Sequence, residues 1–324
     1  MKSLIIKSTH YKYLLKSYGE YLQTTGYAKR TVKAWPIHVQ EFLHYVENKN
    51  ILHIQSIETH HVNDFVAHIK QRRNRNYGGA LSSSSINNII NAVNVFAKFI
   101  NSTSNYFFEH TAQRAQNDTP ERIILTVQEV KKLYEATFLP YIQNSIAMGQ
   151  RDRAIIALYY GCGLRRGEGV NLNITDINLQ ERLLFVRKAK GNKQRLVPIA
   201  SKHLTDISDY IKEGREWFLQ YHTVHTEYQN KYQGKPLERK DIDADDADAF
   251  LLSNNGGRFT CPENRIKYLY KKIAIEKNIT LHGLRHSIAT HLMQSGMSIE
   301  DIAKFLGHSS LISTQIYTHI VNEL

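Results

Sequence analysis

Residues 183–199 read LLFVRKAKGNKQRLVPI and contain two short β-prone runs, at 183–186 and 195–199. The tetrad Lys190-Gly191-Asn192-Lys193 between them supplies the turn residues of a hairpin. Residues 250–253, followed by an Asn-Asn-Gly-Gly stretch, form a candidate third strand and turn. We therefore expect a small antiparallel β-sheet in this part of the chain.

Helical patterns lie on both sides of this sheet region. Thr126-Val127-Gln128-Glu129 is a capping box that opens a helix, residues 154–160 are apolar and helical, and helices resume from Pro262 onward. A polar, charge-dense stretch at 229–248 interrupts the pattern and is interpreted as an exposed insertion of unknown purpose. Its acidic run allows a metal site, but a solvated loop is the stronger interpretation.

The first hundred residues carry four helical patterns, each with apolar residues at i, i+3 and i+4 spacing. The patterns comprise Leu14, Leu15, Tyr18 and Leu22; Val32, Trp35, Val39, Phe42, Leu43 and Val46; Val62, Phe65, Val66 and Ile69; and Ile86, Ile89, Ile90, Val93, Phe96 and Ile100. Polar residues and Pro120 follow. We predict a four-helix domain at 1–105, a linker at 106–122 and a mixed domain at 123–324. The predicted fold is mainly α with a small antiparallel β-sheet.

Length and composition limit the classes of protein. A chain of 324 residues exceeds the usual size of one hydrophobic core, so two domains are expected. Its 42 Lys and Arg outnumber 30 Asp and Glu, which indicates a polyanionic partner such as DNA, RNA or an anionic membrane surface. No apolar run is long enough to span a bilayer. The two cysteines lack metal-type spacing, which fits a reduced, cytoplasmic setting.

Two segments carry basic residues at turns. Gly163-Leu164-Arg165 lies where one helix ends and another begins, and an arginine there can present its planar fork to phosphate oxygens. Lys190 at the hairpin tip can give up a proton when its pKa is lowered. Taken alone, each of these segments is better explained as an ordinary turn, because most Gly-Leu-Arg triplets are turns and a lysine on a turn is usually only exposed.

Two further segments follow in the C-terminal helices. In His282-Gly283-Leu284-Arg285-His286, the first histidine and the arginine are three residues apart and share one helical face. His286 and His291 lie near by in the sequence, and a histidine pair at i, i+4 can ligate zinc. The zincin pattern needs a glutamate directly after its first histidine, and Gly283 follows His282, so a metal is not favoured. Leu306-Gly307-His308-Ser309-Ser310 precedes Tyr317-Thr318-His319. A lone tyrosine on a helix is usually a packing residue.

Together, in this order and at these separations, the four segments resemble the catalytic domain of the tyrosine recombinase (phage integrase) family, in its two-domain, Xer-like branch. The resemblance spans 126–319. The helices at 1–105 resemble the family's core-DNA-binding, SAM-like domain. The resemblance implies a site-specific DNA recombinase or integrase that exchanges strands between two DNA sites.

The resemblance assigns a role to each matching residue. It implies that Tyr317 attacks the scissile phosphate and forms a 3′-phosphotyrosyl link. Arg165 and Arg285 would hold the non-bridging oxygens, and His282 would help to deprotonate the tyrosine.

The same resemblance places three more groups at the site. Lys190 would protonate the leaving 5′-oxygen, His308 would donate to the phosphate, and Glu168 would orient the histidine and arginine side chains. It implies no metal and no cofactor, because the two arginines and the lysine supply the positive charge.

The expected partners are double-stranded DNA at specific sites, a homotetramer on two sites and, in some systems, accessory DNA-bending proteins. The expected location is cytoplasmic, at the bacterial nucleoid. Three departures from the family pattern stand out. Gly169 replaces an apolar residue, the stretch at 229–248 is inserted, and the chain ends one or two helical turns after Tyr317, which leaves open how protomers interlock. The DNA target and the biological outcome, among integration, excision, inversion and chromosome-dimer resolution, are not readable from the sequence.

Three alternatives remain at this point. A type IB topoisomerase-like nicking and closing enzyme would use the same chemistry on one duplex. A DNA-binding relative could keep the fold without chemistry. A metallohydrolase would use His282, His286 and His291 as ligands.

Overall fold

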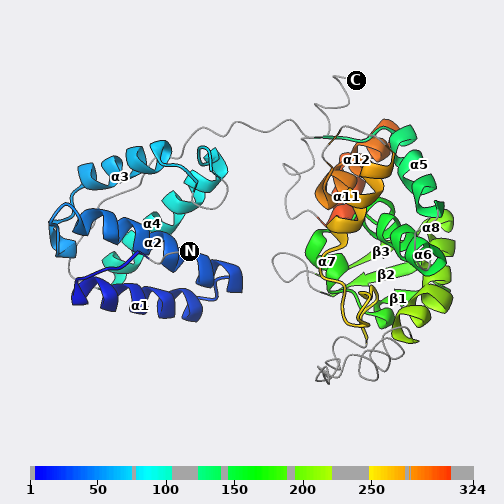
Figure 1. Ribbon diagram of the computed structural model, residues 1–324, viewed down its shortest axis with the longest axis horizontal. Coiled ribbons are helices and arrows are strands. Elements are labelled where there is room, and N and C mark those ends of the chain that lie inside the picture. Colours follow the sequence, from blue (N-terminus) through cyan, green and yellow to red (C-terminus); the bar gives the residue numbers. More distant parts are fainter. Residues whose placement is uncertain are drawn as a thin grey trace, which may run out of the picture. The chain divides into compact units, whose positions relative to one another are not determined.

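The computed structural model describes residues 4–74, 78–103, 123–139, 145–187, 194–220, 248–273, 277 and 279–307. The chain splits into two compact units, Met1–Pro120 and Glu121–Leu324, which Figure 1 draws in sequence colours. The predicted linker at 106–122 lies outside the described residues. Its limits, and with them the proposed domain boundaries, therefore stay a prediction.

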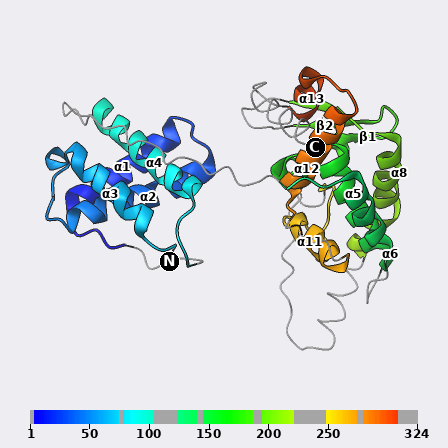
Figure 2. The same cartoon turned by 90° about the horizontal axis from the view of Figure 1, so that it is seen from above.

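The first unit is a helical bundle. It contains α1 (Thr9–Thr24), α2 (Lys29–Glu47), a short 3-10 helix η1 (Ile54–Ser56), α3 (Thr59–Gln71) and α4 (Ser83–Thr103). Figure 2 shows α1–α4 gathered together. Their apolar stripes meet in one core that includes Leu22, Phe42, Phe65 and Phe96, so the four helices predicted from 3.6-residue periodicity are confirmed.

Hydrogen bonds between side chains and the backbone connect the helices of this bundle. The hydroxyl of Tyr18 donates to the carbonyl of Ala92 across the core at 3.0 Å. The carboxylate of Glu47 accepts from the backbone N–H of Lys7 and of Ser8, which fixes the entry to α1. The chain leaves α1 through Gly26, whose φ of +77° is the left-handed conformation that glycine adopts without strain.

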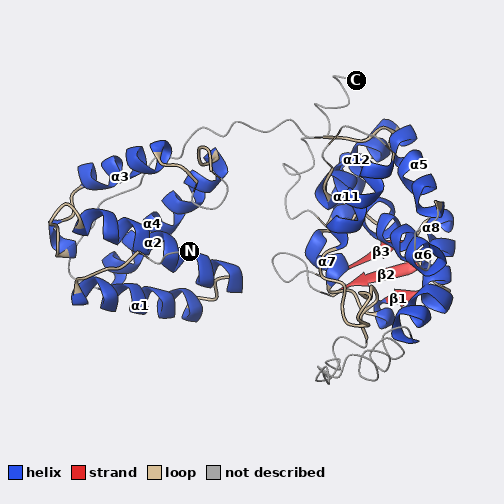
Figure 3. Ribbon diagram, in the orientation of Figure 1, coloured by secondary structure: helices blue, strands red, loops and turns tan. Residues whose placement is uncertain are grey.

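The second unit contains a three-stranded antiparallel sheet in the order β1-β2-β3 (Figure 3). Its strands are β1 (Ile177–Asn178), β2 (Leu183–Val186) and β3 (Arg195–Pro198). In the β2–β3 ladder Leu183 faces Pro198 and Val186 faces Arg195. The predicted hairpin is confirmed in its strands, and its tip at 188–193 lies outside the described residues.

The predicted strand at 250–253 is wrong, because the third strand of the sheet is β1. Residues near 250 are fully buried but form only isolated bridges, Asn173 with Ala249 and Leu252 with Arg258. The N–H of Leu252 donates to the hydroxyl of Tyr210 instead of to a neighbouring strand. An apolar run next to a turn has the composition of a strand, and here side chains and single backbone hydrogen bonds to other segments satisfy its backbone in place of a ladder.

Helices make up most of the second unit. They are α5 (Val127–Glu135), α6 (Ser145–Ile156), α7 (Arg166–Val170), α8 (Ser201–Asp209), α11 (Pro262–Lys272), α12 (Leu281–Gln294) and α13 (Ile299–Leu306), with short helices η2 (Ala136–Phe138), η3 (Ala157–Gly161), η4 (Ile174–Asp176) and η5 (Tyr210–Gly214). The helix predicted at 154–160 is the end of α6 and the π-helical η3. Among the described residues no helix is long and apolar enough to cross a membrane.

The capping box at Thr126 is confirmed. The Thr126 hydroxyl accepts from the N–H of Glu129 at 3.1 Å, and the Glu129 carboxylate accepts from the N–H of Thr126 at 2.7 Å. The buried core of this unit runs through Ile155, Leu158 and Tyr159 on the central helical segment. This segment contacts both α7 and α12, so it links the turn after Gly161 to α12.

Candidate active site

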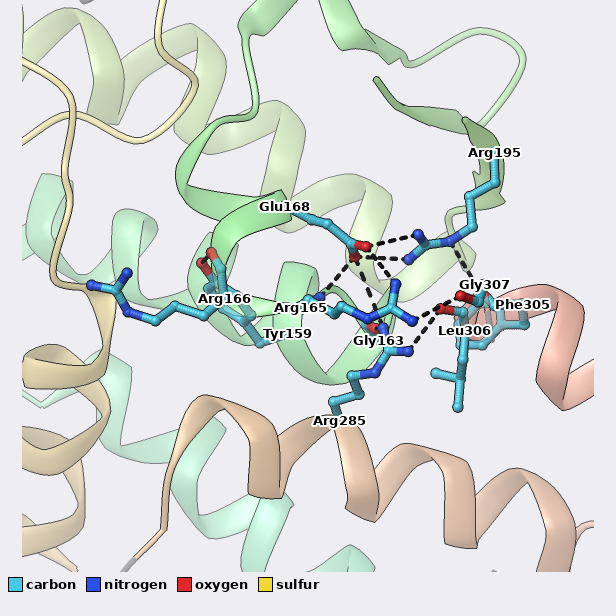
Figure 4. A network of polar contacts seen from close by, with 10 residues as sticks. All are labelled: Tyr159, Gly163, Arg165, Arg166, Glu168, Arg195, Arg285, Phe305, Leu306 and Gly307. Atoms are coloured by element: carbon cyan, nitrogen blue, oxygen red, sulfur yellow. Dashed lines mark hydrogen bonds and ion pairs between the residues drawn. The ribbon is translucent and has the colours of Figure 1, made fainter. Parts of the chain in front are cut away.

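Arg165 and Glu168 are held by the turn that joins η3 to α7. The N–H of Arg165 donates to Glu168 Oε2 at 2.8 Å, so the glutamate caps the first turn of its own helix. The Arg165 guanidinium donates from Nη1 to Glu168 Oε1 at 2.7 Å and from Nη2 to the carbonyl of Gly307 at 2.8 Å. Figure 4 shows these groups converging from α7, α12, β3 and the end of α13.

Gly163 makes the tight approach to α13 feasible. Its φ is +57°, and a Cβ built there would lie 2.8 Å from Leu306 Cδ2 and 3.1 Å from Phe305 Cε1. Any L side chain would be strained and would collide with that helix. The Gly in the Gly-Leu-Arg segment therefore sets how closely the Arg165 turn meets the C-terminal segment.

Arg285 lies at the centre of the cluster. It projects from α12, its side chain is 1% exposed, and its Nη1 is 3.9 Å from Glu168 Oε2. Nη2 donates to the carbonyl of Leu306 at 2.7 Å and Nη1 donates to the carbonyl of Gly163. The fork of Arg285 thus joins the Arg165 turn to the end of α13.

Arg195, at the start of β3, was not among the site residues expected from sequence. Its Nη1 and Nη2 donate to Glu168 Oε1 and Oε2 at 3.0 and 2.9 Å, and its Nε donates to the carbonyl of Phe305 at 3.3 Å. A signal was present, because the strand period of two puts Arg195 on the same face as buried Val197. A charged residue on an inward strand position needs a partner.

Glu168 is the common acceptor of the cluster, and its side chain is 3% exposed. Burial by itself would raise the pKa of this carboxyl. Hydrogen bonds and charge from Arg195 and the N–H of Arg165 overcome that effect and lower the pKa to about 2. Glu168 is therefore an anion at neutral pH and balances part of the charge of the three arginines.

The histidines do not form one group. His282 is exposed near the start of α12, and its ring centroid lies 4.2 Å from that of His286. His291 instead shares a hydrogen bond with the hydroxyl of Tyr160, Nδ1 to Oη 2.9 Å, and burial lowers its pKa. Within the described parts of the chain, no group of three His, Cys, Asp or Glu side chains could hold a metal ion.

Comparisons with known proteins identify the family to which the chain belongs. The profile of the phage integrase family matches residues 123–323, and that of the phage integrase N-terminal SAM-like domain matches residues 14–118. The chain belongs to the phage integrase family. Tyrosine recombinase XerC of Oceanobacillus iheyensis is 28% identical over 319 residues, covering 95% of this chain and 92% of the relative. Tyrosine recombinase XerA of Pyrococcus furiosus is 30% identical over 310 residues, covering 95% and 89%.

Solved structures share the fold of this phage integrase family member. A post-cleavage complex of XerH recombinase with palindromic difH substrate has a TM-score of 0.68 at 20% identity, covering 95% of this chain and 81% of that one. The Tn1549 transposon integrase in complex with circular intermediate DNA has a TM-score of 0.62 at 19% identity, covering 94% of each chain. Both support the predicted arrangement of a helical N-terminal domain and a mixed C-terminal domain.

Gly169, the departure from the family pattern, has a packing explanation. A Cβ at this position would lie 2.5 Å from the hydroxyl oxygen of Tyr159 and 2.7 Å from its Cζ. Tyr159 is fully buried, and its hydroxyl donates to the carbonyl of Arg166 at 3.2 Å. The large tyrosine on η3 takes the space that an apolar residue would fill on α7.

Three expected site residues, Lys190, His308 and Tyr317, lie outside the described residues, as does the predicted insertion at 229–248 except for its last residue. The described chain reaches Gly307, directly before His308. The structure thus brings together Arg165, Glu168 and Arg285, and adds Arg195.

Proposed function

We propose that this chain is a site-specific DNA recombinase that cleaves and rejoins DNA through a 3′-phosphotyrosyl intermediate on Tyr317, exchanging strands between two DNA sites. The observation that carries the proposal is that Arg165 and Arg285 converge on the buried carboxylate of Glu168. Arg165 also contacts Gly307, the residue directly before His308. The Xer relatives match the chain over nearly its whole length, which supports the same activity here.

Arg165 is the phosphate-binding group that solvent reaches, since its side chain is 27% exposed. Its contacts with Glu168 and Gly307 use two of the five N–H donors of the guanidinium, which leaves a donor-rich edge for the non-bridging oxygens. Arg285 is 1% exposed, so its contact with phosphate requires the groups around it to rearrange. Arg165, which Glu168 and Gly307 hold in place, is thus the donor fixed in advance to stabilise the charge that grows on phosphorus-bound oxygens during attack.

In the cleavage step the phosphoryl group is transferred from the 5′-oxygen of DNA to the tyrosine. The phenol oxygen of Tyr317 forms a bond to phosphorus as the P–O5′ bond breaks. His282 takes the phenol proton, because a tyrosine with a pKa near 10 is a poor nucleophile at neutral pH. Lys190 gives a proton to the leaving 5′-oxygen, and His308 donates to the phosphate.

Rejoining reverses these steps with the 5′-hydroxyl of a partner strand. The phosphotyrosyl ester keeps the energy of the cleaved bond, so the reaction needs no nucleotide cofactor. Three cationic side chains, Arg165, Arg285 and Lys190, supply the charge that a metal ion supplies in other nucleases, so the proposed reaction is metal-independent. The proposed assembly is a homotetramer on two DNA sites, with accessory DNA-bending proteins where a site requires them.

The test is a strand-exchange assay in excess EDTA. Duplexes selected from a random library by the Tyr317→Phe protein supply the site, in two lengths with different end labels. The proposal expects recombinant products of new length carrying both labels. Relaxation or nicking of single duplexes without exchange would indicate a topoisomerase-like enzyme, and loss of all activity in EDTA would contradict metal independence.

A further inference from the structure

We infer that Arg195 is a positioning residue for strand cleavage, which sets the orientation of the phosphate-binding arginines by clamping Glu168 and the end of α13. The inference rests on the proposed function. Arg195 is not placed on the phosphate itself, since its side chain is 10% exposed and its fork is directed at the carboxylate.

Arg195 holds Glu168 in a bidentate pair. Both guanidinium Nη atoms donate, one to each carboxylate oxygen, at 3.0 and 2.9 Å. Such a fork fixes the rotation of the carboxylate, which a single contact does not. Glu168 Oε1 also accepts from Arg165 Nη1 at 2.7 Å. By fixing the plane of the carboxylate, Arg195 therefore also orients the Arg165 guanidinium.

The same arginine takes part in a second set of contacts. Three successive carbonyls at the end of α13 each accept from a different arginine: Phe305 from Arg195, Leu306 from Arg285 and Gly307 from Arg165. These carbonyls are acceptors that no helical turn satisfies, and the helix dipole makes them favourable sites for cations. The triple contact fixes the backbone from which His308 continues.

Gly307 shows how closely Arg195 fits this helix end. Gly307 caps α13 with a φ of +64°, and a Cβ there would lie 2.8 Å from Arg195 Cδ and 2.9 Å from its Nη1. The stem of Arg195 therefore fills the space that a side chain would take. Arg195 contacts two parts of the cluster, α7 through Glu168 and the end of α13 through Phe305 and Gly307, although it lies on the sheet rather than on a helix of the site.

Glu168 provides the link to pH. Arg195 from β3, Arg285 from α12 and Arg165 from its own turn face the carboxylate, with the Tyr159 hydroxyl of η3 in its electrostatic surroundings. Without Arg195, burial still disfavours the anion while its bidentate partner is lost, so the pKa of Glu168 rises. A variant lacking Arg195 then begins to protonate Glu168 at a pH where the wild type does not.

The experiment measures single-turnover covalent trapping on nicked suicide DNA at saturating protein, for wild type, Arg195→Gln and Arg195→Lys. The rate constant reports the geometry of the site and the amplitude reports the folded, active fraction. Arg195→Gln should slow trapping about 10- to 100-fold with DNA affinity changed less than about threefold. Arg195→Lys keeps the charge but not the fork, so it should recover only part of the rate.

The ratio of wild-type to Arg195→Gln rate constants should grow as the pH is lowered from 8 to 5.5. Groups that titrate alike in both proteins cancel in this ratio. In a Glu168→Gln background, adding Arg195→Gln should slow the single-turnover rate constant little further, because both residues act through one contact. The ratio of the rate constants with and without Arg195 should then no longer depend on pH.

Arg265→Gln is the matched control. Arg265 makes a bidentate pair with the fully buried Asp152, both contacts at 2.9 Å, away from the cluster. This variant should lose stability and amplitude but keep the wild-type rate constant and pH profile. If Arg195→Gln behaves like Arg265→Gln, Arg195 is only structural and the inference fails. If wild type itself forms no covalent product, the proposed function fails instead.

Discussion

The two glycines that flank Glu168 on α7 should respond in opposite directions to the same substitution. Around Gly167 nothing lies within 4 Å of the position that a methyl group would take, whereas a Cβ on Gly169 would lie 2.5 Å from the Tyr159 hydroxyl oxygen. Gly167→Ala therefore adds helix propensity without collision. Gly169→Ala forces a buried ring or the backbone of α7 to move.

The magnitudes follow from these contacts. Alanine in place of a helical glycine stabilises by about 0.5–1 kcal/mol, which is the effect expected for Gly167→Ala. For Gly169→Ala, overpacking costs about 1–3 kcal/mol, and displacement of Tyr159 weakens its part-buried hydrogen bond to the carbonyl of Arg166, worth about 1 kcal/mol. After the propensity gain is subtracted, a net loss of roughly 1–3 kcal/mol is expected.

Thermal unfolding of the full chain measures both changes. For a domain of this size about 1 kcal/mol moves the midpoint by about 2–4 °C, so Gly169→Ala should lower the transition of the second unit by several degrees and Gly167→Ala should raise it slightly. In a Tyr159→Phe background the closest atom is gone, so the Gly169→Ala loss should shrink but persist, because Cζ stays 2.7 Å away. Equal shifts for both alanine variants would refute the packing explanation of Gly169.

Two further predictions concern charged groups of the site. Glu168→Gln removes a carboxylate whose pKa is held at about 2 against an ordinary 4.5, so the free energy of unfolding at pH 7 should fall by roughly 3 kcal/mol. A carboxyl whose pKa is lowered by folding stabilises the folded state fully only above its pKa in the unfolded chain. Urea titrations should therefore show the difference in free energy of unfolding between wild type and Glu168→Gln shrinking from pH 4.5 towards pH 2. A difference that stays constant with pH would contradict the assignment. Lys190→Ala should slow single-turnover cleavage about 100-fold or more but weaken DNA binding less than about threefold, because one charge is a small part of the electrostatic footprint. Equal losses in rate and affinity would argue against a general acid.

Local patterns predicted most elements of the fold. The 3.6-residue period located the four helices of the first unit, and the Thr126 capping box located the start of α5. The strands β2 and β3 followed from β-prone runs on either side of turn residues. The strand predicted at 250–253 was wrong because hydrogen bonds from side chains and single bridges satisfy a buried apolar run as well as a ladder does.

The sequence placed Arg165, Glu168 and Arg285 in one candidate site, and the structure brings these three side chains together, but no pattern indicated which atoms contact one another. Arg165 and Arg285 are far apart in sequence, and only the resemblance to the family joined them before the structure did. The bidentate pair of Arg195 with Glu168 depends on how β3 is positioned relative to α7, and no local sequence pattern predicts that tertiary arrangement. The space that Tyr159 takes beside Gly169 likewise depends on tertiary packing. The catalytic roles of all the expected site residues stay predictions, including those of Lys190, His308 and Tyr317, which lie outside the described residues.

Covalent trapping of DNA on Tyr317 tests the central claim most directly. Nicked suicide duplexes, carrying a sequence selected for binding, are incubated with the protein in EDTA and the products are separated on a denaturing protein gel. The account predicts a slower protein–DNA band for wild type that is absent from Tyr317→Phe and is mapped to Tyr317 by peptide mass analysis. No band on a duplex that the protein binds, or an undiminished band from Tyr317→Phe, would contradict it.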